Sequence, residues 1–187
     1  MDIKQVERYS QLMLDRAALE LINSLTPEGE DLLHDRDWAA ESFRRWELEP
    51  HEPTEAELAE LRELRSMLRR LAGTVSEARL LSPSQLAELN AVISAPVRAE
   101  LRILDGAYFV EMTPDAGTWI EAAVRELAGS FSSMLRHSHP PRLRLCANES
   151  CRIAYYDESR SRTRRWCDPS GCGNRARVRR HRARRAA

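Results

Sequence analysis

The chain has 187 residues and a formal net charge of zero, a length that suits one domain of ordinary size plus a small module. The charge is unevenly divided: residues 1–141 carry 15 basic and 25 acidic residues, whereas residues 142–187 carry 14 arginines and 4 acidic residues. No stretch reaches the roughly 20 apolar residues of a membrane span, and the first ten residues lack the apolar segment of a signal peptide. We therefore expect a cytoplasmic protein, without membrane attachment, whose basic part binds a polyanion.

The first half of the chain predicts helices. Apolar residues recur every three or four positions over residues 3–25. A second helix is expected from about Asp37, with two tryptophans and a phenylalanine among its apolar residues. Prolines in residues 50–53 predict a break after this helix.

The next two helices carry N-terminal signals. Thr54 and Glu57 form a capping box, and Gly73 is the expected C-terminal stop of that helix. Ser82 and Gln85 repeat the capping pattern, with a proline at the first helical position. The residues of this second helix that we expect to face inward are Leu86, Leu89, Val92 and Ile93.

The apolar period changes to two after residue 96. Apolar residues alternate with charged ones over 97–103, which predicts a half-buried strand. Asp105 and Gly106 form a strong turn signal, because glycine tolerates the positive φ that a tight hairpin needs. The partner strand is expected to end near residue 112, and a last helix covers about residues 116–136.

These elements predict an α+β chain that is predominantly helical. We expect a helical N-terminal domain over residues 1–137 with one hairpin near 97–112, a linker over 138–141, and a C-terminal module over 142–187. Trp38, Trp46 and Trp119 are expected at the edge of the core, with a ligand pocket as the alternative. Because no catalytic arrangement of residues stands out, we do not expect an enzyme.

Four cysteines lie close together in the basic part and nowhere else: Cys146, Cys151, Cys167 and Cys172. Their spacing is two C-x4-C pairs separated by 15 residues. Two short loops that each give two thiolates meet the tetrahedral preference of zinc. A closed site of four thiolates leaves no position for water, so we expect one structural Zn²⁺ per chain rather than a catalytic one. Disulfides, an iron–sulfur cluster and free buried thiols stay open as alternatives, as do His137 and His139 as ligands.

The segments around these cysteines also carry local predictions. Aromatic and β-branched residues in 152–159 and 163–167 predict two short strands in the spacer. Gly173 is expected to let the backbone pass close to the metal, and Asn174 to cap a helix that runs to about residue 185. Cys172 would then lie at the helix N-terminus, where a thiolate is favoured, and Val178 would pack back on the cysteine loops.

The segment "LCANESCRIAYYDESRSRTRRWCDPSGCGNRARVRRHRARR" resembles the CGNR zinc-finger family of bacterial proteins, named for the residues that stand here at 172–175. "ALELINSL" and "DLLHDRDWAAESFRRW" resemble the start of the N-terminal ABATE-type domain that accompanies this finger and is regarded as a stress-induced transcriptional regulator. The resemblance implies that the four cysteines are zinc ligands and that the module binds DNA.

Arginine pairs well with phosphate and with guanine edges, so the residues after the first cysteine loop predict a nucleic-acid surface. The candidate contact residues are Arg164, Arg165, Asn174, Arg175, Arg177, Arg179, Arg180, Arg182, Arg184 and Arg185. Arg164, Arg165 and Arg175 could instead neutralise the charge of the metal centre.

We expect DNA rather than RNA as the partner of this surface. One alternative is an RNA or ribosome binder, in which Tyr155, Tyr156 or Trp166 stacks on bases. Another is an interaction protein whose acidic domain covers the basic module. A homodimer formed through the N-terminal domain is also open.

Overall fold

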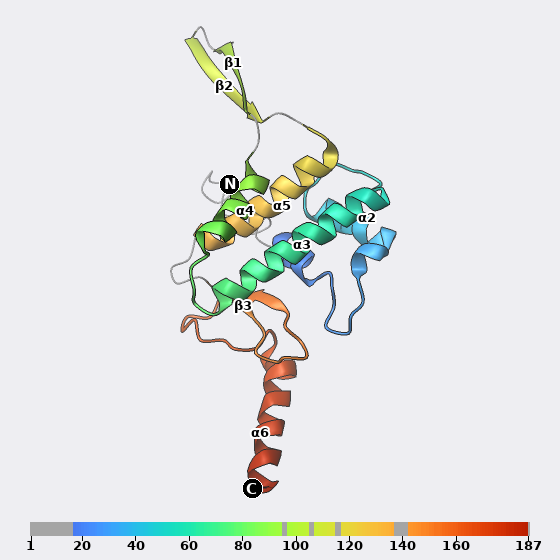
Figure 1. Ribbon diagram of the computed structural model, residues 1–187, viewed down its shortest axis with the longest axis vertical. Helices are drawn as coiled ribbons and strands as arrows, with labels where there is room; N and C mark the ends of the chain where they lie inside the picture. Colours follow the sequence, from blue (N-terminus) through green and yellow to red (C-terminus); the bar gives the residue numbers. More distant parts are fainter. Residues whose placement is uncertain (1–16, 95–96, 105–106, 115–116, 137–141, 187) are drawn as a thin grey trace.

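The computed structural model describes residues 17–94, 97–104, 107–114, 117–136 and 142–186 (Figure 1). A helical segment over 17–23 comes first. The elements that follow are η1 (Leu32–His34), α2 (Arg36–Arg45), α3 (Glu55–Ser76), α4 (Pro83–Ile93), β1 (Val97–Leu104), β2 (Ala107–Pro114), α5 (Trp119–Arg136), β3 (Leu143–Leu145), β4 (Ala154–Tyr156), η2 (Pro169–Gly173) and α6 (Asn174–Ala186). The predicted class, α+β and predominantly helical, is confirmed.

Helix α3 runs through the middle of the helical body, which we define as residues 17–94 and 117–136 (Figure 1). Its apolar stripe is fully buried from Leu58 to Val75 and packs against α5, which in turn packs against α4. The segment 17–23 contributes Leu21 and Ile22 to the same core. Because apolar residues recur with a helical period, each helix can bury one face against α3.

Both predicted capping boxes are present. The Thr54 hydroxyl accepts from the backbone N–H of Glu57, and the Glu57 carboxylate accepts from the N–H of Thr54. Ser82 and Gln85 make the same reciprocal pair at α4. These local signals were reliable because each bond joins residues only three apart.

Two predictions for these helices are wrong. Helix α3 does not stop at Gly73 but continues to Ser76, because Ala72 and Val75 are buried in the core and packing there outweighs the low helix propensity of glycine. Leu86 does not face inward; it is 46% exposed, and only Leu89 of α4 is fully buried.

The tryptophans form an aromatic cluster at the edge of the core. Trp46 is buried and packs edge-on to Trp38, with ring centroids 6.2 Å apart. Trp119 packs against Phe43 and donates from Nε1 to the carbonyl of Glu49. Of the two expected roles, the structure shows packing at the core edge.

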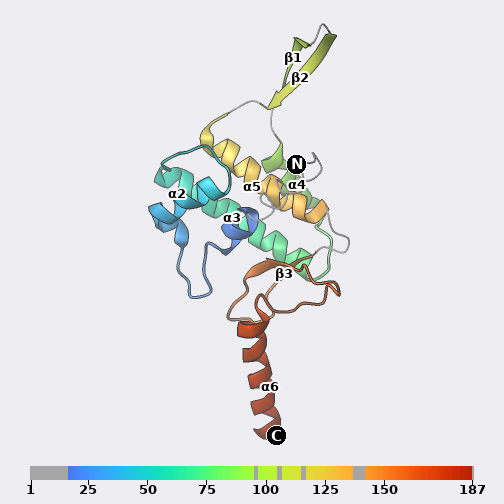
Figure 2. The ribbon, with the colours of Figure 1, turned by 180° about the vertical axis from the view of Figure 1, so that it is seen from behind.

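The hairpin of β1 and β2 forms with the predicted pairing but is not half-buried. Leu101 lies opposite Val110 and Ile103 opposite Tyr108, so four apolar side chains share one face. These side chains are exposed, Leu101 by 69% and Tyr108 by 74%. The hairpin projects from the body in both views (Figures 1 and 2). Its exposed side chains show that, of the residues the structure describes, none packs closely over them. The predicted turn at 105–106 lies outside the described residues, as does the linker.

The C-terminal part joins the body through a second small sheet. Strand β3 packs on α3, and Leu143 and Ala154 belong to the same buried cluster as the body helices. The Asn23 side chain donates to the carbonyl of Ala154 and accepts from its N–H, both at 2.9 Å. The body and the cysteine-bearing segment therefore share a continuous core at this junction.

The expected strand over residues 163–167 is absent from the described structure. Strand β4 pairs instead with β3, with Leu143 opposite Tyr156 and Leu145 opposite Ala154. The 163–167 segment is held by isolated bonds, including the Ala147 N–H to the carbonyl of Arg165. The residue types alone gave a wrong prediction here. The backbone of such a segment can be held by hydrogen bonds to side chains, as where the N–H of Arg164 donates to the Asp157 carboxylate, and it then needs no partner strand.

Candidate metal centre and basic helix

The four cysteine thiols lie together between two loops. Their Sγ atoms are all within 4.8 Å of one another. The Sγ of Cys167 is 3.6 Å from that of Cys151 and 3.8 Å from that of Cys172. Cys146, Cys151 and Cys172 are buried and Cys167 is partly buried, so the centre is nearly closed to solvent.

This geometry fits a tetrahedral metal ion. A metal–sulfur bond of ~2.3 Å places the sulfurs of a tetrahedron about 3.8 Å apart, close to the two separations above. A disulfide needs sulfurs about 2.05 Å apart, and all four cysteines are free in this structure. The arrangement could therefore hold one zinc ion through four thiolates, with no fifth group needed.

The backbone of the first loop, residues 146–151, is fixed on both sides. The N–H of Cys146 donates to the carbonyl of Ile153 at 2.8 Å, and the N–H of Cys151 donates to the carbonyl of Asn148 at 2.8 Å. Arg152 then adopts φ +52, which turns the chain back into β4. The two thiols of this loop are thus placed by a tight turn between paired strands.

The second loop is capped by Asp168 rather than by Asn174, so the predicted cap is wrong. The Asp168 carboxylate accepts from the N–H groups of Ser170 and Gly171 and begins the π-helical turn η2. Asn174 already has helical dihedral angles and continues that turn into α6. The sequence did contain a signal for the correct cap. Aspartate caps a helix N-terminus as well as asparagine does, and Asp168 follows directly after Cys167.

Gly173 lies against an aromatic ring. A β-carbon at this position would lie 3.3 Å from Cδ1 of Trp166, closer than ordinary van der Waals contact. The partly buried Trp166 packs against the cysteine cluster. A side chain at this position would therefore press against the Trp166 ring, and the expected close approach of the Gly173 backbone to a metal stays a prediction.

Helix α6 begins beside the thiols and acts on their charge. Arg175 donates from Nη2 to the Sγ of Cys172 at 3.0 Å, and this lowers the pKa of the Cys172 thiol to about 7. Burial raises the pKa of the Cys151 and Cys167 thiols. A cation at the centre reverses that burial effect, because metal binding requires deprotonated thiols.

A buried carboxylate supports the long spacer between the cysteine pairs. Asp157 is fully buried and accepts from the N–H and hydroxyl of Ser159 and from the N–H of Arg164. Burial alone would raise the pKa of Asp157, but these hydrogen bonds outweigh it and hold the pKa below its usual value. The Tyr155 hydroxyl donates to the carbonyl of Arg164, and burial raises the Tyr155 pKa to about 12.

The predicted contact residues separate into two groups. Arg164 is used structurally: its guanidinium donates to the carbonyls of Trp166 and Cys167 and lies over the Tyr155 ring. Arg165 is exposed and lies over the Trp166 ring. Those on α6 are all exposed: Asn174, Arg175, Arg177, Arg179, Arg180, Arg182, Arg184 and Arg185.

Helix α6 points away from the rest of the molecule and ends at the pole opposite the hairpin (Figures 1 and 2). Among the residues that the structure describes, none of its arginines forms a salt bridge with a carboxylate. Val178 does not pack back on the loops as predicted and is 41% exposed; Ala176 is the residue buried at the base. The helix is thus a projecting, uncompensated positive surface.

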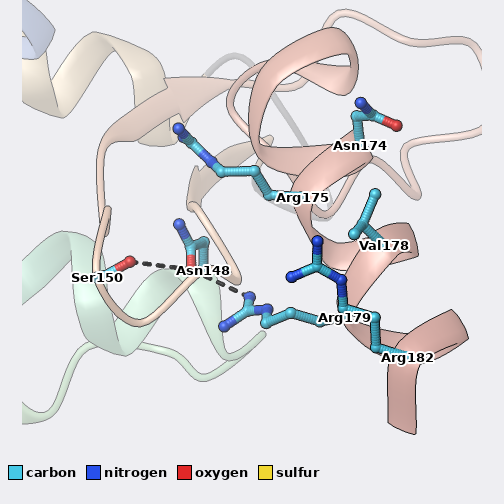
Figure 3. A pocket seen from close by; sticks show the side chains of 7 residues that line it. All are labelled: Asn148, Ser150, Asn174, Arg175, Val178, Arg179 and Arg182. Atoms are coloured by element: carbon cyan, nitrogen blue, oxygen red, sulfur yellow. Dashed lines mark hydrogen bonds between the residues drawn. The ribbon is translucent and has the colours of Figure 1, made fainter.

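A cleft of about 320 Å³ lies between the first cysteine loop and one face of α6 (Figure 3). It is lined by Asn148, Ser150, Asn174, Arg175, Val178, Arg179 and Arg182. The sequence predicted Asn174, Arg175, Arg179 and Arg182 as contact residues, but Asn148 and Ser150 were missed. The only available signal for those two was their position inside the C-x4-C loop.

The comparisons agree with this architecture. The CGNR zinc finger model matches residues 142–185, and the ABATE model, described as "Putative stress-induced transcription regulator", matches residues 15–138. Neither is an enzyme family. A search of curated proteins found no match.

No helix in the described ranges is both long and apolar enough to cross a membrane. The ABATE model covers more than half of the chain, and the finger follows it in the order that the sequence predicted. The chain therefore belongs to the ABATE family and ends in a CGNR zinc finger.

Proposed function

We propose that this protein is a zinc-dependent DNA-binding regulator of transcription, in which the metal centre presents α6 to DNA. The observation that carries the proposal is the continuity of the cysteine loop with α6: Cys172 lies in η2, and α6 follows without a break. A metal that fixes Cys172 thus also fixes the start of the arginine-rich helix. The family descriptions, a zinc finger and a regulator of transcription, support the same role.

The metal is one structural zinc ion per chain, held by Cys146, Cys151, Cys167 and Cys172. Four thiolates complete a tetrahedron, so the ion supplies rigidity and charge and leaves no position for a reacting water. The Arg175 guanidinium beside Cys172 offsets part of the negative charge of such a centre. Because thiols stay reduced in the cytoplasm, that compartment suits the site.

Duplex DNA is the partner that the helix suits best. An α-helix of 13 residues is about 20 Å long and fits the major groove, which is about 12 Å wide. The base-stacking surface expected of an RNA binder is less accessible. Tyr155 is buried with its hydroxyl bonded, and Trp166 is partly covered at the metal centre.

The N-terminal domain, residues 1–137, is the proposed regulatory part, with 138–141 as the linker and 142–187 as the binding module. Masking of α6 by the acidic domain of its own chain is not favoured, since α6 projects from the body (Figure 1). Dimerisation through the N-terminal domain stays a proposal. The exposed apolar face of the hairpin, which carries Leu101 and Tyr108, is the surface we would test for it.

The test is a titration of the zinc-loaded protein with duplex DNA over a range of salt. If about six arginines each neutralise one phosphate, log K should fall with log salt with a slope of about −5. Structured RNA of equal length serves as competitor and should displace the duplex poorly. Failure to bind duplex DNA at low salt with zinc present would end the proposal, and tighter binding of RNA would replace it with the RNA-binding alternative.

A further inference from the structure

We propose that the cleft between the first cysteine loop and α6 is a binding site for one phosphodiester group, and that Asn148 positions Arg179 within it. This inference rests on the proposed function, because the phosphodiester is taken to belong to the DNA backbone. The inference goes further than the proposed function in two ways. It assigns one phosphate to a particular position, and it adds two neutral residues, Asn148 and Ser150, to the arginines expected to contact the DNA backbone.

The charge of the cleft favours an anion. Arg175, Arg179 and Arg182 line it from one face of α6, and none of its lining residues is acidic. Arg175 is already bonded to the Cys172 sulfur, whereas in the described part of the chain neither Arg179 nor Arg182 has a carboxylate partner. Two guanidiniums that share a cleft without a counter-charge repel each other until an anion binds between them.

The Asn148 side chain links the thiol cluster to this face. It is 5% exposed, and its amide donates from Nδ2 toward the Sγ of Cys172 at 3.8 Å. Its Oδ1 accepts from Nη2 of Arg179 at 3.2 Å and from the Ser150 hydroxyl at 3.2 Å. Figure 3 shows Asn148 between Ser150 and Arg179, with Arg182 one turn further along α6.

These contacts fix which groups a phosphate would meet. A thiolate attracts the amide N–H₂ and thereby turns Oδ1 toward Arg179, so the metal centre sets the direction of that guanidinium. The donors left free to reach a phosphate oxygen are the remaining N–H groups of Arg179, the guanidinium of Arg182 and, after a rotation, the Ser150 hydroxyl. The cleft has a volume of about 320 Å³, which leaves room for a phosphate group.

The experiment compares single variants of the full zinc-loaded chain for duplex DNA affinity and zinc content. Arg179→Ala should weaken binding about tenfold, which corresponds to about 1.4 kcal/mol, because it removes a charge-assisted contact to the phosphate. Arg184→Ala is the matched control, because it removes the same charge from the opposite face of α6, and it should weaken binding by less. Ser150→Ala should weaken binding about fivefold without any change in charge, with the exposed Ser161→Ala as its control.

Asn148→Ala tests the positioning role. It should weaken binding as Arg179→Ala does, and the double variant Asn148→Ala/Arg179→Ala should bind no more weakly than Arg179→Ala alone. Additive losses would mean that Asn148 acts independently of Arg179 and would overturn this part of the proposal. If Asn148→Ala loses zinc, Asn148 acts on the metal centre as a whole and the positioning part of the proposal is overturned. The Ser150 and Arg179 variants then decide whether the cleft binds a phosphate.

The outcomes separate this inference from the proposed function. If the wild-type chain fails to bind DNA, the proposed function fails. If it binds, but Ser150→Ala matches wild type and Arg179→Ala matches Arg184→Ala, the cleft proposal is overturned while the function stands. Saturable binding of inorganic phosphate that requires Arg179, with no effect of these variants on DNA, would also overturn it, because the cleft would then serve a free anion.

Discussion

The helical body and the cysteine-bearing module are stabilised in different ways. The body buries a continuous set of large apolar side chains, among them Phe43, Leu61, Leu68 and Phe131. Around the thiols, by contrast, the buried cluster consists of three cysteines with Ile153, Trp166 and Cys167 packed against it. Burial of apolar surface can fold the first region without a ligand, whereas the second has too small a core and needs cross-links or a metal.

Their charges differ in the same way. In the body, the buried Arg65 is paired internally: it donates to both carboxylate oxygens of Asp31, at 2.5 and 2.7 Å. The arginines of α6 are exposed, and among the described residues none of them forms a salt bridge with a carboxylate. The body thus relies on its own apolar core, whereas the module carries a thiol cluster that suits a metal ion and a helix whose guanidiniums have no carboxylate partner among the described residues.

Removal of the metal should give the largest effect. We expect Cys172→Ser, or a strong chelator, to unfold residues 157–186 and to abolish DNA binding, because zinc binding supplies about 10 to 16 kcal/mol in small zinc modules. The body should stay folded. Metal analysis, circular dichroism and hydrogen exchange of α6 and α3 amides measure these outcomes. If Cys172→Ser retained one zinc per chain, the ligand assignment would be contradicted. If the amides of α3 lost their protection from hydrogen exchange, the independent stability of the body would be contradicted.

Breaking the buried ion pair of the body should have the next largest effect. Asp31→Asn leaves the Arg65 guanidinium, 6% exposed, without its counter-charge, so we expect a loss of about 3 kcal/mol in unfolding free energy by urea denaturation. The exposed pair of Glu41 and Arg44 provides the control, and Glu41→Gln should change stability by less than about 0.5 kcal/mol.

The same pair predicts a pH dependence. The hydrogen bond from Arg65 holds the pKa of Asp31 below its usual value of 3.8. The pair therefore contributes fully at pH values above 3.8, and the contribution is lost as the pH falls below it. Asp31→Asn should flatten the acid limb of a stability–pH curve. An unchanged acid limb would show that Asp31 titrates alike in the folded and unfolded chain.

A smaller effect tests the junction between the two regions. Asn23→Ala removes both hydrogen bonds to the backbone of Ala154 and leaves its buried N–H and carbonyl without them, so we expect a loss of about 1 to 3 kcal/mol. If the junction couples the regions, hydrogen exchange should quicken in β3 and β4 as well as near residue 23. Asn90→Ala, at an exposed position of α4, is the control. Faster exchange confined to the body would show that the regions are not coupled there.

Much of the fold could be predicted because its signals are local. The capping boxes at Thr54 and Ser82, the hairpin pairing of β1 with β2, and the clustering of the four cysteines all follow from residue types at short spacings. Several of the errors were of another kind. Gly73, Leu86 and Val178 were assigned from their own propensities or periodicity, but which neighbour packs on each of them depends on segments far away in the chain.

By itself, the sequence determined the helical class, the order of the two regions, the thiol cluster and the basic helix that follows it. Only the tertiary structure decided that β4 pairs with β3 on the surface of α3, and that Asn23 bonds to Ala154, 131 residues away. It likewise decided that Asn148 joins the Cys172 thiol to Arg179. The reason is physical: periodicity and caps act within a few residues, whereas these contacts join segments whose meeting is fixed by the packing of the whole chain.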